Sequence, residues 1–180
     1  MMRINNEIEY KTLVSEDQFN RLLAHFTISK TIHQTNTYFD TADRKLKAMR
    51  IACRIRVSDV MIEATVKEST DEGILEYNQT LETFDPDVFK TKEFRNLFKR
   101  LHMTEPLFEI GNASTTRFIV EEEQGELCFD RTVFQNHTDF ELEYEVKVDA
   151  QLGYARFMHI LELEDIPYVA SKSKMIRATT

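Results

Sequence analysis

Apolar and polar residues alternate with a period of two along most of this chain. In the stretch CRIR, the apolar residues Cys53 and Ile55 alternate with Arg54 and Arg56. Successive side chains of a β-strand point to opposite faces, so this pattern predicts strands with one apolar and one ionic face. Eight segments show it, near residues 4–14, 33–40, 50–58, 60–68, 73–82, 113–123, 125–134 and 138–149. Most of the connections between them are short, which favours an antiparallel sheet.

Three further segments repeat apolar residues at the spacing of an α-helix. In SEDQFNRLLAHF, Ser15 and Gln18 form a predicted capping box, and an apolar stripe begins at Phe19. The other two segments are KEFRNLFKRL, residues 92–101, and GYARFMHIL, residues 153–161. Each segment is apolar on one side only, so we expect these helices to pack on the outside of the sheet.

The composition fits one globular unit. The 180 residues are 42% hydrophobic and 30% charged, which is enough to build one substantial core. The 4 glycines and 3 prolines are scattered and form no linker, so we expect a single domain over residues 1–180. The glycines also lie too far apart for a P-loop or a dinucleotide-binding fingerprint.

Charge and cysteine content indicate the surroundings of the protein. The net charge of −8 argues against nucleic acid or an anionic membrane as a partner. No run of about 18 apolar residues is present, so we expect no membrane span. Cys53 and Cys128 have no metal or redox spacing and are predicted to be free thiols, which favours a cytoplasmic location.

The charges on the ionic faces are sorted by strand. The middle strands carry basic residues: Arg54, Arg56, Lys67 and Arg117. The first and last strands carry acidic ones: Glu7, Glu9, Glu141, Glu143 and Glu145. Arginine suits the bidentate recognition of phosphate, and paired carboxylates offer the hard oxygen ligands of Mg²⁺ or Mn²⁺. A charged face on one strand is usually only solvated, but the sorting across strands favours a binding site.

Curling of the sheet would bring these charges together. If the first strand meets the last, the ionic faces enclose a polar bore and the apolar faces receive the helices. Two adjacent rows of glutamates would then repel each other unless a divalent cation neutralised them. The basic rows opposite would attract a polyanion.

The ordered motifs resemble the CYTH superfamily of triphosphate tunnel metalloenzymes, most closely its small Firmicute-type members that are often labelled adenylate cyclase. The matching motifs are E-x-E-x-K at 7–11, NTYFDT at 36–41, CRIR at 53–56, TVK ending at Lys67, LEYNQ at 75–79, TTRF at 115–118, CFD at 128–130 and ELEYE at 141–145. They cover residues 5–147. The resemblance implies an α+β fold built on a closed eight-stranded antiparallel barrel, whose polar tunnel holds a triphosphate together with Mg²⁺ or Mn²⁺.

The resemblance also implies roles for individual residues in triphosphate hydrolysis. The expected substrate-binding residues are Lys11, Arg54, Arg56, Lys67, Arg117, Lys172 and Lys174. The expected metal ligands are Glu7, Glu9, Glu141 and Glu143, with Asp130 and Glu145 either binding metal or orienting an arginine. The expected catalytic residues are Lys11, Arg56, Lys67 and Glu76, although Glu76 could equally serve only in a structural ion pair.

Two departures and two other functions stay open at this stage. Thr115 stands where many relatives carry a basic residue, and SKSKMIRATT offers Lys172, Lys174 and Arg177 without a secure alignment. The same site could instead act as an adenylate cyclase, in which the ATP 3′-hydroxyl attacks the α-phosphorus. It could also bind polyphosphate or a nucleotide without turnover. The sequence leaves the oligomeric state open between monomer and homodimer.

Overall fold

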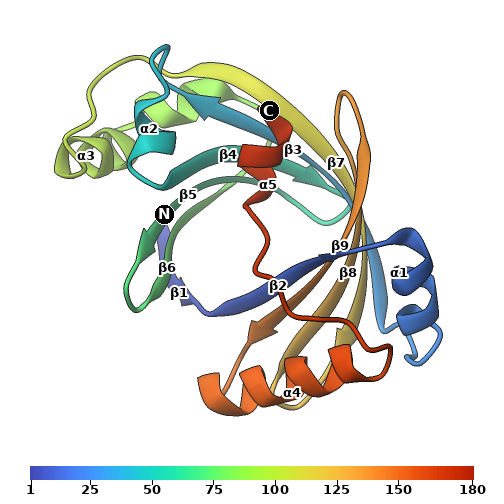
Figure 1. The fold of residues 1–180 in the computed structure, drawn as a ribbon. Helices are drawn as coiled ribbons and strands as arrows, with labels where there is room; N and C mark the ends of the chain where they lie inside the picture. Colours follow the sequence, from blue (N-terminus) through green and yellow to red (C-terminus); the bar gives the residue numbers. More distant parts are fainter.

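The computed structural model describes residues 1–180 and contains one strongly curled antiparallel sheet of nine strands (Figure 1). The strands are β1 (Arg3–Glu7), β2 (Glu9–Val14), β3 (Lys30–Asp40), β4 (Ile51–Ser58), β5 (Ile62–Thr70), β6 (Gly73–Leu81), β7 (Phe108–Glu121), β8 (Gly125–Val133) and β9 (Thr138–Val146). The helices are α1 (Glu16–Leu23), α2 (Lys45–Ala48), η1 (Pro86–Lys90), α3 (Lys92–Arg100), α4 (Ala150–Glu162) and α5 (Lys174–Ala178). None of these helices combines the length and apolar character needed to cross a membrane.

The segment predicted as the first strand forms two strands, and these lie at opposite ends of the sheet. β1 pairs with β6 and β2 pairs with β9, and Ile8 lies between them, its carbonyl accepting the Val146 N–H at 2.9 Å. The strand order is β1-β6-β5-β4-β3-β7-β8-β9-β2, so β1 and β2 are the two ends. The structure therefore does not confirm a closed barrel of eight strands. It has nine strands in an open order, because residues 3–14 divide their pairing between two neighbours.

The three predicted amphipathic helices lie on the outside of the curl (Figure 1). The apolar face of β4 to β6 packs against α3, with Val66 and Phe94 fully buried in the shared core. The apolar face of β7 to β9 packs against α1 and α4, with Phe129 and Phe157 fully buried. The capping box at Ser15 is present as predicted. The prediction that the apolar side of the sheet faces the helices is therefore confirmed.

The C-terminal segment, from which Lys172 and Lys174 were expected to contribute to the site, crosses the concave side of the sheet and ends in α5 (Figure 1). Ala170 forms a β-bridge with Thr12, and Met175 packs in a small core. α5 approaches β7 at Gly111, where a Cβ atom would lie 2.8 Å from the Ala178 carbonyl oxygen. Any larger residue at position 111 would displace this oxygen. The glycine therefore allows α5 to pack closely against β7.

Candidate active site

The concave side of the sheet encloses a cavity of about 520 Å³, open to one side. Of the residues that the sequence singled out, those lining it are Glu7, Glu9, Lys11, Arg54, Arg56, Lys67, Glu76, Arg117, Glu143, Glu145 and Lys174. All of them except Lys174 converge because each lies on the ionic face of its strand, and the curl turns all these faces inward. Lys174 reaches the cavity from α5. Asp130 and Glu141 are fully buried in the wall, and the exposed Lys172 does not line the cavity.

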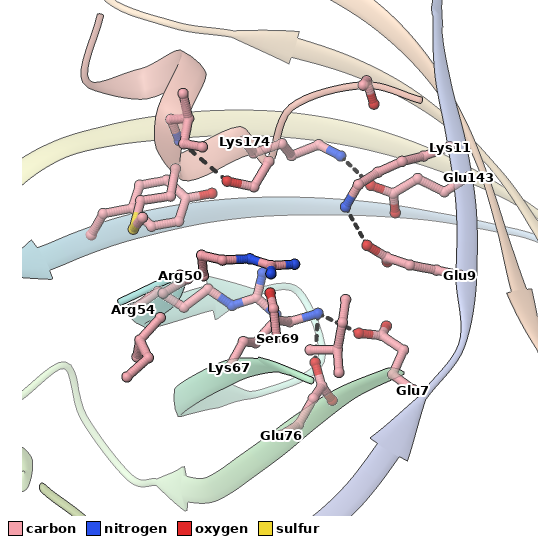
Figure 2. Close-up of a pocket in the computed structure, with 18 of the residues that line it drawn as sticks. Glu7, Glu9, Lys11, Arg50, Arg54, Lys67, Ser69, Glu76, Glu143 and Lys174 are labelled. Carbon is pink, nitrogen blue, oxygen red and sulfur yellow. Dashed lines mark hydrogen bonds and ion pairs between the residues drawn. The ribbon is translucent and has the colours of Figure 1, made fainter. Parts of the chain in front are cut away.

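One wall of the cavity is built around the Lys67 ammonium group (Figure 2). Lys67 on β5 lies opposite Glu76 on β6, and its Nζ is 2.5 Å from Glu76 Oε1 and 2.6 Å from Glu7 Oε2. Burial raises the pKa of Glu7 to about 7, and repulsion from the nearby glutamates adds to this, although Lys67 opposes it. Burial also opposes the charge of Glu76, but attraction from Lys67 and Arg54 lowers its pKa to about 2.

A second group of charges lies where β2 meets β9. Lys11 forms an ion pair with Glu9, and both side chains line the cavity (Figure 2). In the ladder, Glu9 lies opposite Glu145 and Lys11 lies opposite Glu143. Burial raises the pKa of Glu145. The prediction that the acidic rows lie side by side is therefore confirmed for Glu9, whereas Glu7 lies on β1 opposite Ile74 of β6.

Arg54 and Arg56 differ from the other predicted cations because neither forms an ion pair with a carboxylate. Arg56 Nε donates instead to the neutral side chain of Asn36, at 2.9 Å. Burial, together with repulsion from Arg54 and Arg117, lowers the pKa of Arg56 to about 9. A bound anion would relieve this repulsion, so these two arginines form the part of the wall best suited to hold one.

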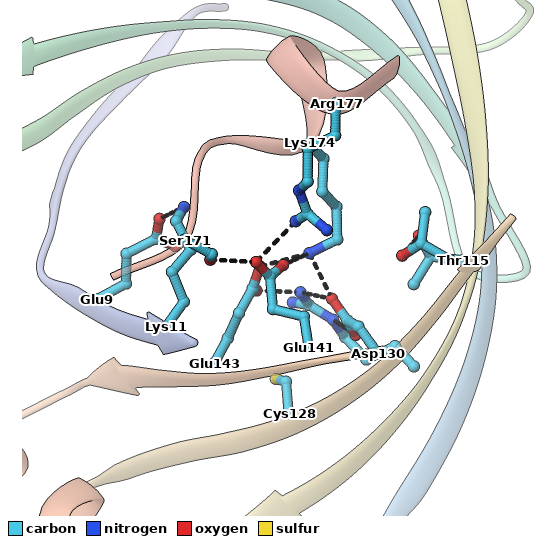
Figure 3. Close-up of polar contacts among 12 residues, drawn as sticks. Glu9, Lys11, Thr115, Cys128, Asp130, Glu141, Glu143, Ser171, Lys174 and Arg177 are labelled. Atoms are coloured by element: carbon cyan, nitrogen blue, oxygen red, sulfur yellow. Dashed lines mark hydrogen bonds and ion pairs between the residues drawn. The ribbon is translucent and has the colours of Figure 1, made fainter. Parts of the chain in front are cut away.

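Behind the cavity, three carboxylates surround the ammonium group of Lys174 (Figure 3). Asp130, Glu141 and Glu143 each offer an oxygen, and these oxygens lie within 4.8 Å of one another. Lys174 Nζ is 2.8 Å from Asp130 and 2.5 Å from Glu143, and it also contacts Glu141. The carboxylates are on β8 and β9, whereas the lysine is on α5, so this cluster also anchors the C-terminal helix.

Two arginines complete the neutralisation of this acidic cluster. Arg117 donates two hydrogen bonds of 2.7 Å to Asp130 and also contacts Glu143. Arg177 donates to Glu141 at 2.7 Å. Burial opposes the charge of Glu143, but attraction from Lys174 and Arg117 holds its pKa well below the usual range. The balance of charge that we expected from a divalent cation is supplied here by side chains, so the acidic rows alone do not require a metal.

Two sets of carboxylates could hold a divalent cation: the close-set oxygens of Asp130, Glu141 and Glu143, and the more accessible Glu7 and Glu9. The two glutamates line the open cavity, and each has only a lysine as its ion-pair partner. The oxygens of Asp130 and Glu141 are instead held by buried cationic side chains. A cation could therefore reach Glu7 and Glu9 by displacing an ammonium group, whereas entry among the buried carboxylates requires α5 to move.

Some residues of the site lay outside the sequence-based assignments. Tyr38 and Asn36 point inward from β3, and both belong to the motif NTYFDT, which matched as a string but received no role. Arg50 lines the cavity from the end of a short helix, where alternation gives no signal (Figure 2). Ser171 contacts Glu141 from the C-terminal segment (Figure 3). Thr115, the departure from the basic pattern, is buried, and its hydroxyl lies 2.9 Å from that of Thr132.

Comparison with known proteins places the chain in one family. The sequence profile of the CYTH domain matches residues 5–179. A Bacillus subtilis protein named "Putative triphosphatase YjbK" is 30% identical over 177 residues, which cover 95% of this chain and 93% of that protein. The crystal structure of a "putative adenylate cyclase" from Bacillus halodurans is 31% identical, covers 98% of this chain and 99% of that one, and superposes with a TM-score of 0.88.

A Hippeastrum protein shares the fold at greater distance. It is named as an adenylyl cyclase with a dominant triphosphatase activity, and it is 24% identical, with a TM-score of 0.75 over 96% of this chain and 94% of that one. At this identity the likeness is one of fold. The match to the family profile over nearly the whole chain, together with the two relatives above, shows that this protein belongs to the CYTH domain family.

Proposed function

We propose that this protein hydrolyses the terminal phosphoanhydride bond of a triphosphate, with Mg²⁺ or Mn²⁺ as cofactor. The observation that carries the proposal is the pair Arg54 and Arg56, which line the cavity without a carboxylate partner in a chain of net charge −8. Unpaired arginines in a partly closed cavity suit phosphate oxygens. The relationship to a protein named as a triphosphatase supports the same reaction.

In this proposal the basic residues position the phosphates and stabilise the leaving group. Arg54 and Arg56 hold phosphate oxygens, and Lys11 and Lys67 exchange their glutamate partners for the substrate. A water oxygen bonds to the terminal phosphorus and gives up a proton to solvent, while the bond from that phosphorus to the bridging oxygen breaks. Negative charge therefore develops on the bridging oxygen, which leaves with the diphosphate, and the terminal group is released as orthophosphate. Fixed positive charges near that oxygen lower the barrier.

The acidic residues have two separate tasks in this proposal. Glu7 and Glu9 hold the cation, which would neutralise phosphate charge and make a water molecule more acidic. Glu76 keeps Lys67 in place, because their ion pair lies directly across the β5–β6 ladder. Glu143 and Glu145 face the cavity and are further candidate ligands. Asp130 and Glu141 are assigned to the anchoring of Lys174 and Arg177.

A release assay tests the proposed reaction. The purified protein is incubated with tripolyphosphate, thiamine triphosphate, ATP or GTP, in Mg²⁺, in Mn²⁺ and in EDTA. We expect orthophosphate release from at least one compound with either cation and none in EDTA. Cyclic AMP and pyrophosphate from ATP would instead establish the cyclase reaction, which the name of the Bacillus halodurans relative favours. Tight binding without any product would establish a binding module.

We predict that cation affinity depends on pH through Glu7. A proton competes with the metal for a carboxylate, so affinity falls as pH drops below the pKa of about 7. For a single group, Mn²⁺ should bind about tenfold more weakly at pH 6 than at pH 8. Isothermal titration calorimetry on the unaltered protein and on Glu7→Gln measures this. The variant should bind weakly at both pH values, and equal affinity of the unaltered protein at pH 6 and pH 8 would contradict the assignment.

The cellular location and the partner of the protein are part of the same proposal. Both cysteines are buried and free, in keeping with a reducing cytoplasm. The expected partner is a small triphosphate and not nucleic acid.

A further inference from the structure

Asn36 occupies a position that is unusual for an asparagine. It is fully buried in the middle of β3, a strand that is paired on both sides. Asparagine is disfavoured in strands, and a buried polar side chain without partners costs free energy. On the β7 side, the residue opposite is Ala113, which offers no polar side chain. On the β4 side, the residue opposite is Arg56.

The contact between Asn36 and Arg56 has one possible polarity. The guanidinium group of Arg56 can only donate, so the atom of Asn36 that lies 2.9 Å from Arg56 Nε is the carbonyl oxygen Oδ1. The amide nitrogen Nδ2 of Asn36 is then left without a hydrogen-bond partner, although it is buried. It is therefore a spare donor beside the guanidinium group, on the same inward face of the sheet.

Arg56 shares with Arg54 the lack of a carboxylate partner, but only Arg56 of the two is held by a neutral side chain, since the Nε of Arg54 has no hydrogen-bond partner. Lys11, Lys67 and Lys174 each contact at least one carboxylate, and so does Arg117. A carboxylate fixes the direction of a cation but also cancels its charge. An amide oxygen fixes the direction and leaves the charge available for another anion.

We infer that Asn36 is a positioning residue for the proposed reaction: its amide oxygen aims the Arg56 guanidinium group at a phosphate oxygen without neutralising it. The inference rests on the proposed function, since it names how one of the phosphate-binding residues is held. Asn36 therefore acts mainly through Arg56, and its effect should vanish when Arg56 is absent.

Replacing Asn36 by aspartate separates the orientation of the Arg56 guanidinium group from the availability of its charge. Asn36→Asp keeps the shape and the hydrogen bond to Arg56 Nε, but it adds the carboxylate that the native site avoids. Losing one charge-assisted contact of Arg56 should weaken tripolyphosphate binding about tenfold or more. Asn36→Ala, which removes the orientation but adds no charge, should weaken it less. Calorimetry in EDTA measures the dissociation constant, and orthophosphate release with Mg²⁺ measures kcat/KM.

A double-mutant cycle with Arg56→Ala decides whether Asn36 works through Arg56. In the Arg56→Ala background, we expect Asn36→Asp and Asn36→Ala to weaken tripolyphosphate binding by less than about threefold, because the effects of neighbouring residues that act together are not additive. The matched control is Gln34→Glu, which makes the same chemical change on the same face of β3 without contact to Arg56. This control should bind tripolyphosphate more tightly than Asn36→Asp does.

The outcomes separate this inference from the proposed function. If the unaltered protein binds or hydrolyses tripolyphosphate and the Asn36 variants match it, the inference is overturned and the function stands. Effects of Asn36 and Arg56 that multiply in the cycle would also overturn it, because a purely structural role predicts independence. If the unaltered protein neither binds nor hydrolyses any compound of the panel, both fail together. Should Asn36→Asp not fold, the cycle with Asn36→Ala gives the same decision.

Discussion

Replacing Arg56 by alanine is expected to lower kcat/KM for triphosphate hydrolysis by about 100-fold or more, the usual consequence of removing one group that stabilises transition-state charge. Arg56 faces the cavity without a carboxylate partner, and Arg54 and Arg117 are close enough to repel it. Its charge is therefore available to a phosphate and is not engaged in holding the fold. We expect the thermal midpoint to change little, and steady-state orthophosphate release with Mg²⁺ to show the loss.

The control for this variant is Arg131→Ala. Arg131 follows Asp130 on β8, so its side chain lies on the opposite face of the sheet. It is exposed and does not line the site cavity. The two variants remove the same side chain from the same sheet, so they differ only in the face from which it is lost. Equal activity of both variants, each at the level of the unaltered protein, would remove Arg56 from the site and with it the observation that carries the proposed function.

The inward direction of the site residues could be predicted because it depends only on the period of a strand. Arg54, Arg56 and Lys67 lie on alternate positions, and an alternating apolar face fixes which side they share. The sorting of basic and acidic rows by strand indicates a polyanion site from the sequence alone. The ladder that places β2 beside β9 was also anticipated, since the acidic rows were expected to meet.

The pairing of individual charges could not be predicted in the same way. Lys174 and Asp130 are more than forty positions apart, and only the path of the C-terminal segment through the curl brings them together. α5 has five residues, too few for a helical stripe to stand out. For the same reason Lys172 and Lys174 appeared equivalent in the sequence, whereas one is exposed and the other lies among three carboxylates.

The division of the first strand had a comparable cause. Residues 4–14 show one continuous alternation, and nothing in that pattern reveals a change of partner at Ile8. Local sequence determines which face a side chain takes, but the neighbour of each strand depends on how far the whole sheet curls. Alternation therefore counted residues 4–14 as one strand and gave eight in all, whereas the change of partner at Ile8 makes nine.

Replacing Lys174 by methionine is expected to lower the free energy of unfolding at pH 8 by about 3–5 kcal/mol, the cost of removing one partner from a buried ion pair. Methionine keeps the length of the side chain but leaves Asp130, Glu141 and Glu143 with only Arg117 and Arg177 as counterions. Urea unfolding followed by circular dichroism measures the change. The matched control is Lys172→Met, which removes the same charge from an exposed position and should change stability by less than about 0.5 kcal/mol.

The pH dependence separates loss of a counterion from loss of packing. In the unaltered protein, the cationic side chains hold the pKa values of Asp130 and Glu143 below their usual range, although burial opposes this. At Asp130 and Glu143 the folded state therefore binds fewer protons than the unfolded state, and the stabilisation from these two groups is lost as pH falls through the acidic range. Burial raises the pKa of Glu141, which acts in the opposite direction. Without Lys174, burial should raise these pKa values, so protonation stabilises the folded variant as pH falls from 8 to 5. The difference in stability between the two proteins should therefore narrow at pH 5, whereas a difference independent of pH would mean that Lys174 contributes packing alone.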